Sequence, residues 1–129
     1  MEQAYLDLLS AKNELRKIQQ KHRICLIANA SKEAALEHWI ETEGGRKVTD
    51  NLETPIAIVL SLLDCYPESK QGLTIAFEIG SSHPTVSRYL TGDLGNYGQY
   101  FEKCNGEYRL TEEGILFISE WLGTNNHED

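Results

Sequence analysis

Apolar residues recur at alternating spacings of three and four along the first quarter of the chain. This spacing is that of a coiled-coil seam, and it predicts one long helix over residues 2–28. The opposite face of this helix is strongly charged, so the seam is either a dimerisation surface or a face that packs on the rest of the chain. The seam consists of Met1, Ala4, Leu8, Ala11, Leu15, Ile18, His22 and Cys25.

A second helix is expected after a break at Asn29-Ala30-Ser31, with Ser31 as its N-cap. Its apolar stripe is formed by Ala35, Leu36, Trp39 and Ile40, and Gly44-Gly45 ends it. The polar, aperiodic stretch 46–53 is interpreted as a linker.

The pattern therefore divides the chain into an N-terminal helical segment (1–51), a second domain (52–124) and a short tail (125–129). The second domain opens with a helix, for which Thr54 is the expected N-cap and Pro55 the first helical residue. This helix is apolar over most of its circumference, which predicts a central place in a core. Its apolar residues are Ile56, Ile58, Val59, Leu60, Leu62, Leu63 and Cys65. Tyr66-Pro67 ends it, and a loop follows up to Gly72.

Residues 73–90 show the spacing of a helix-turn-helix, in which two short helices cross through a tight turn. Ala76 is small where the helices approach, Gly80 supplies a turn with positive φ, and Val86 fills the core from the second helix. Ser82 is the expected cap of the second helix, with Pro84 just inside its start. The outward face of this helix is polar around a single arginine, a composition suited to the DNA major groove. The residues expected on it are Ser82, His83, Thr85, Ser87, Arg88 and Thr91.

Two short runs, Tyr100–Cys104 and Glu107–Leu110, are joined by Asn105-Gly106, the strongest short-range signal for a two-residue β-hairpin. Thr111 follows as the expected cap of a final helix with acidic residues in its first turn. The buried side of that helix is assigned to Ile115, Leu116, Ile118, Ser119 and Leu122.

The order helix, helix-turn-helix, hairpin, together with the phrase Tyr108-Arg-Leu-Thr-Glu-Glu-Gly114, resembles the winged-helix domains of small prokaryotic regulators such as MarR-, ArsR- and PadR-like proteins. The similarity covers Thr54 to Leu122. It implies a mainly α fold with a small β-hairpin (α+β), and a second helix that reads the major groove. It also implies that the hairpin is a wing that touches DNA through Lys103, Asn105 and Arg109.

Charge qualifies this expectation, because phosphate neutralisation supplies much of the affinity of DNA-binding proteins. The chain has a formal net charge of −8, and residues 52–124 hold four Lys/Arg against ten Asp/Glu. The N-terminal helix carries a basic cluster around Lys17, which is a further candidate for phosphate contact. The leading hypothesis is a homodimeric, sequence-specific regulator that binds double-stranded DNA and pairs through its N-terminal helix. The alternative is an acidic winged-helix module that binds another protein.

Other chemistries have no motif in this sequence. No phosphate-binding loop, dinucleotide fingerprint, nucleophile elbow or His-Glu-x-x-His is present, so an enzyme is not expected. Three scattered cysteines predict neither a disulfide framework nor a zinc site, and no cofactor is expected. The N-terminus lacks the pattern of a secretory signal and no apolar run is long enough for a membrane span, so a cytoplasmic location is the expectation.

Overall fold

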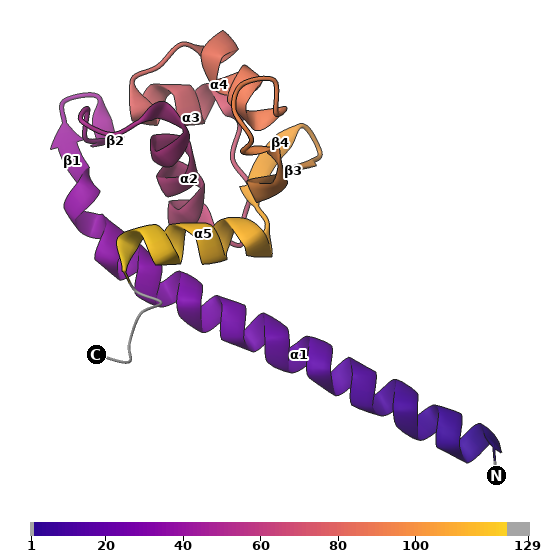
Figure 1. The fold of residues 1–129 in the computed structure, drawn as a ribbon. Helices are drawn as coiled ribbons and strands as arrows, with labels where there is room; N and C mark the ends of the chain where they lie inside the picture. Colours follow the sequence, from indigo (N-terminus) through magenta and orange to yellow (C-terminus); the bar gives the residue numbers. More distant parts are fainter. Residues whose placement is uncertain (1, 124–129) are drawn as a thin grey trace.

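The structure is a computed structural model and describes residues 2–123. The chain is mainly helical, with two small antiparallel hairpins that form separate two-stranded sheets (Figure 1). This agrees with the α+β class expected from the sequence. The predicted tail, 125–129, and Met1 of the seam lie outside the described residues. The elements are α1 (Glu2–Ala35), a 3₁₀ turn η1 (Leu36–His38), β1 (Trp39–Thr42), β2 (Gly45–Val48), α2 (Thr54–Cys65), α3 (Gly72–Ile79), α4 (His83–Leu90), η2 (Gly98–Tyr100), β3 (Phe101–Cys104), β4 (Glu107–Leu110) and α5 (Glu112–Leu122).

Helix α2 lies at the centre of the core. Every residue from Pro55 to Leu63 is buried, and α2 contacts α1, α3, α4, α5 and both hairpins. The central position predicted from its apolar circumference is therefore confirmed. Its start was predicted one residue late. Glu53 occupies the cap position without a side-chain cap, so Thr54 is the first helical residue and Pro55 the second.

The predicted break at Asn29-Ala30-Ser31 is wrong, because α1 continues without interruption to Ala35. Its packed face consists of Ile24, Ala28, Ser31 and Ala35, at spacings of four, three and four, and all four are at most 2% exposed. This face lies against α5 and α2. Burial on that scale outweighs the weak tendency of Asn and Ser to leave a helix.

The predicted second helix is also wrong from Trp39 onward, and the predicted linker is wrong over residues 46–48, which lie in a strand. Residues 39–48 form the β1–β2 hairpin, with Trp39 paired to Val48 and Thr42 to Gly45. Glu43 and Gly44 make its turn, and Gly45, the first residue of β2, has φ of 120°. The Arg46 guanidinium lies 4.5 Å from the centre of the Trp39 ring, so a residue assigned to a linker covers an aromatic ring instead.

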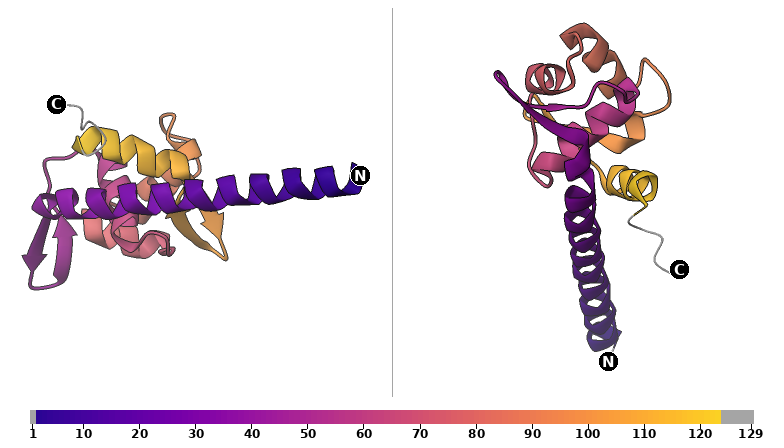
Figure 2. Two further views of the ribbon diagram at one scale, coloured as in Figure 1. Left: turned by 90° about the horizontal axis from the view of Figure 1, so that it is seen from below. Right: turned by 90° about the vertical axis from the view of Figure 1, so that its left-hand side faces the viewer.

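The helices are arranged in layers (Figure 1), with α3 and α4 on one side of α2 and α1 with α5 on the other. The second half of α1 belongs to the same hydrophobic core as α2 and α5. The first half projects beyond the folded domain, as Figure 2 shows from two further sides. All side chains from Gln3 to Arg23 are exposed, including the seam residues in that range.

Candidate nucleic-acid interface

The α3–α4 pair has the geometry expected from Ala76, Gly80 and Val86. Helix α3 ends at Ile79, and Gly80 follows in the left-handed conformation with φ of 67°. The Ser81 amide then donates to the Ala76 carbonyl at 3.0 Å, which closes the end of α3. Ala76 is 4% exposed and Val86 is fully buried. The register that the sequence predicted for these two helices is confirmed.

Helix α4 is fixed at both ends by its own hydroxyl groups. At its start the Ser82 hydroxyl accepts a hydrogen bond from the Thr85 amide at 3.3 Å. At its end the Thr91 hydroxyl donates to the Ser87 carbonyl at 3.0 Å. The helix stops at Leu90 because Gly92 takes a positive φ of 89°. The cap at Ser82 that the sequence predicted is therefore confirmed.

The predicted outward residues of α4 lie together on one helix, opposite the buried Val86 and Leu90. Ser82, His83, Arg88 and Thr91 are exposed, whereas Thr85 and Ser87 are half-buried beside them. Arg88 forms no salt bridge with any residue that the structure describes. Its guanidinium therefore offers its donors to a ligand rather than to a neighbouring carboxylate.

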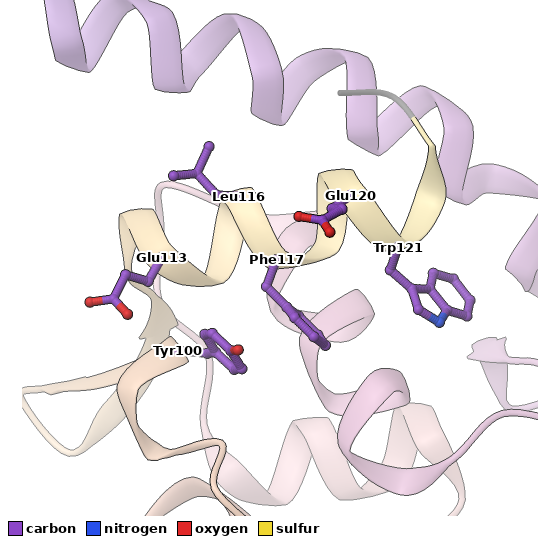
Figure 3. Close-up of a pocket in the computed structure, with 6 residues that line it drawn as sticks. All are labelled: Tyr100, Glu113, Leu116, Phe117, Glu120 and Trp121. Atoms are coloured by element: carbon purple, nitrogen blue, oxygen red, sulfur yellow. The ribbon is translucent and has the colours of Figure 1, made fainter. Parts of the chain in front are cut away.

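Aromatic contacts of tyrosine side chains hold the segment after α4 against the rest of the domain. The Leu94 amide donates to the Arg88 carbonyl at 3.1 Å, and the Tyr97 ring lies 6.4 Å from Tyr89 and 6.2 Å from Phe117, measured between ring centres. These contacts join the end of α4 to α5. Tyr100 stacks on Phe117 at 4.5 Å at the edge of a shallow pocket of about 580 Å³ on α5 (Figure 3).

The β3–β4 hairpin has the predicted two-residue turn. Cys104 pairs with Glu107, and both turn residues, Asn105 and Gly106, have positive φ (53° and 80°), as a type I′ turn requires. Thr111 then caps α5, since its hydroxyl accepts from the Gly114 amide at 3.1 Å. The hairpin and the capped final helix are therefore confirmed.

The charges of this hairpin are largely paired within it. Arg109 donates to the Glu102 carboxylate on the opposite strand. That hydrogen bond, with the charge of Glu102, raises the pKa of the Arg109 guanidinium. The Lys103 ammonium lies 5.9 Å from the centre of the Tyr108 ring. Three residues of this hairpin were predicted to touch DNA. Arg109 is hydrogen-bonded to a carboxylate and Lys103 lies near an aromatic ring, whereas Asn105 is exposed at the tip and has neither kind of contact with the described residues.

Lys70 lies in the stretch predicted as a loop, and no role was expected for it from the sequence. Its backbone exchanges two hydrogen bonds of 2.8 Å with Tyr108 of β4. Its ammonium donates to the Glu78 carboxylate at 2.6 Å and to the Ser61 carbonyl at 2.8 Å. One residue thus connects the hairpin, α2 and α3. The available signal was Glu78, the one charged residue of a short and mostly apolar helix, because a carboxylate in such a helix needs a partner where it is buried.

Lys17 is not brought to α4. It lies on α1 with its ammonium 3.8 Å from Glu14, and Figures 1 and 2 show α1 and α4 on opposite sides of α2. The candidate residues therefore fall into three places, namely the outward face of α4, the β3–β4 hairpin, and the far side of the domain.

Comparison of the chain with protein-family models, with curated proteins and with solved structures finds no match. Within residues 2–123, none of the helices combines the length and the apolar character that crossing a membrane requires.

Proposed function

We propose that residues 52–124 are a winged helix-turn-helix domain and that the protein is a sequence-specific, double-stranded-DNA-binding transcription regulator. The observation that carries this proposal is the exposed polar face of α4, held by a left-handed Gly80 and a buried Val86. A capped helix of this size fits the major groove, where hydroxyl groups contact bases or phosphates. Arg88, which forms no salt bridge with a described residue, can bond guanine through two donors.

The hairpin has a smaller part in this proposal. Glu102 already accepts the hydrogen bond of Arg109, so that cation has little to offer a phosphate. Asn105 at the tip remains available for a polar contact. Because few cations offset the acidic side chains of this domain, we expect weak non-specific binding that disappears as salt rises.

The proposed regulator is a homodimer that pairs through the seam of α1. Leu8, Leu15 and Ile18 are 53%, 54% and 62% exposed on a helix that projects from its own domain. Apolar side chains repeated at this spacing are covered when a second copy packs against them. A helix with this much apolar surface left exposed by the described residues supports association.

The test is fluorescence anisotropy of the full chain with mixed-sequence duplexes at low and moderate salt, followed by selection of a preferred site. Arg88→Ala should weaken the preferred site by about 1–3 kcal/mol and reduce the preference between sites. Lys17→Ala is the matched control, because it removes an exposed cation of α1, the helix that Figure 1 shows across α2 from α4, and it should leave binding unchanged. Absence of duplex binding at low salt contradicts the proposal.

A protein-docking module is the second candidate, and one observation favours it. Leu73 and Phe77, one turn apart on α3, are 63% and 48% exposed. The Lys47 ammonium lies 4.8 Å from the Phe77 ring, so the surface is apolar with a basic edge. In a docking module, Phe77→Ala weakens partner binding and Arg88→Ala does not. In a DNA-binding regulator, Arg88→Ala weakens duplex binding and Phe77→Ala does not.

A further inference from the structure

The seam of α1 faces away from the domain that α1 carries. Leu15 precedes the buried Ile24 by nine residues, which is two and a half turns of a helix, so the two side chains point in opposite directions. Leu26 stands on the seam side where α1 runs beside the domain, and it is 57% exposed. Helix α1 therefore has a domain face around Ile24 and Ala28 and an outer face around Leu15 and Leu26.

Helix α4 lies on the other side of the domain. Its Val86 and Leu90 are buried, and α2 contacts both α4 and α1. Figure 1 shows α4 and α1 on opposite sides of α2. Because Val86 and Leu90 form the buried side of α4, we infer that its exposed side faces away from α2 and α1. The outer face of α1 and the exposed face of α4 are thus the two opposite ends of one protomer.

We propose that the homodimer joined through the outer face of α1 presents its two α4 helices in opposite directions and holds two separate DNA duplex segments. This inference rests on the proposed function, because it takes both the seam dimer and duplex binding by α4 from it. A two-fold operation that pairs the outer faces places the two domains on opposite sides of the helix pair. This holds whether the two copies of α1 run parallel or antiparallel.

Dimeric helix-turn-helix proteins commonly use a different arrangement, in which two recognition helices lie one helical turn apart on one palindromic site. Such a site needs both helices to face the same side of one duplex, about 34–36 Å apart. In the seam dimer, α4, α2 and α1 are stacked in each copy. With packed helices roughly 8–10 Å apart, this separates the two α4 helices by about 45 Å. The two α4 helices also face opposite directions. This orientation, more than the separation, prevents both helices from binding the same straight duplex.

DNA stiffness prevents one short duplex from serving both sites. The persistence length of duplex DNA is about 150 base pairs, so a segment of 20 base pairs cannot turn back around the dimer. The two sites therefore bind either two molecules or two distant segments of one molecule. In a regulator this geometry closes a loop or joins neighbouring segments.

The experiment uses the full chain and a 20-base-pair duplex obtained by selection from randomised duplexes on this protein. One portion of the duplex is biotinylated and bound to beads, and a second portion carries fluorescein. Bead-bound duplex is loaded with protein, washed, and offered the fluorescent duplex. We expect the dimer to retain the fluorescent duplex, and sedimentation in solution to show two duplexes per dimer.

Leu15→Asp should give a monomer that still binds one duplex and loses the capture of the second. Asn13→Asp is the matched control, since it adds the same charge to an exposed position on the other side of α1 and should leave capture intact. Arg88→Ala should weaken both duplexes equally. One duplex per wild-type dimer overturns the bridging inference and leaves the proposed DNA binding standing. A protein that binds no duplex, or that stays monomeric at tens of micromolar, overturns the proposed function and this inference together.

Discussion

Replacement of Lys70 by methionine removes one partner of a buried ion pair and leaves the other in place. The Lys70 and Glu78 side chains are 11% and 18% exposed, and their charged atoms are 2.6 Å apart. In Lys70→Met, the hydrogen bond from the Ser61 hydroxyl, at 2.7 Å, is the one that Glu78 keeps among residues 2–123. A largely buried carboxylate has lost most of its hydrating water. One hydrogen bond does not make up for that loss of hydration free energy.

Removal of one member of a buried pair typically costs about 3–5 kcal/mol. Because both groups retain some exposure, we expect Lys70→Met to lower the free energy of unfolding by roughly 3 kcal/mol. This is a large part of the 5–15 kcal/mol that stabilises an ordinary domain. Urea denaturation followed by circular dichroism measures it directly.

Two comparisons make the result interpretable. Lys17→Met breaks the pair with Glu14, whose side chains are 71% and 67% exposed in the order Lys17, Glu14, and should change stability by less than about 0.5 kcal/mol. Lys70→Met combined with Glu78→Leu removes both buried charges and should recover part of the loss. If Lys70→Met costs no more than Lys17→Met, or if the double variant is simply additive, the pair is not the connection inferred from the structure.

The remaining predictions concern the α3–α4 turn and the cysteines. Gly80→Val should destabilise the protein by more than Gly80→Asn, because asparagine tolerates the left-handed φ of 67°, and equal melting temperatures would contradict the register. Val86→Asp should abolish cooperative unfolding, since an unpaired carboxylate at a fully buried site costs several kcal/mol, and a normal thermal transition would refute its burial. Iodoacetamide at pH 8 should label the exposed Cys25 before Cys65, because burial raises the pKa of the Cys65 thiol and lowers its thiolate fraction; faster labelling of Cys65, read by peptide mass, would be the contrary result.

Features of the fold that depend on a few neighbouring residues could be predicted from the sequence. Gly80 and Ser82 specify a turn and a cap through the conformations and hydrogen bonds of their own residues. Asn105-Gly106 specifies a hairpin in the same way. In each case the competing conformations are restricted locally, so distant contacts have little to add.

Features that depend on distant packing could not be predicted in this way. Ser31 looks like a cap in isolation, but it is fully buried in the middle of the face that α1 presents to α5 and α2. Trp39 has helical spacing with its neighbours, but it pairs with Val48 in a strand and is covered by Arg46. The energy that decides both positions comes from residues that the local pattern does not contain.

The same distinction between local and distant interactions applies to the candidate site. One contact that was not predicted, between Arg109 and Glu102, could have been predicted from the sequence. The polar face of α4 follows from helical periodicity. The place of Lys17 depends instead on the packing of α1, the helix that Figure 1 shows across α2 from α4. The pairing of Arg109 with Glu102 is different, because the Asn105-Gly106 turn fixes the register of the two strands. Counting back from a two-residue turn puts Glu102 directly opposite Arg109, where opposite charges attract. The sequence therefore already contained the reason why this arginine is a poor phosphate ligand, and why Arg88 is the cation on which duplex recognition depends in the proposed function.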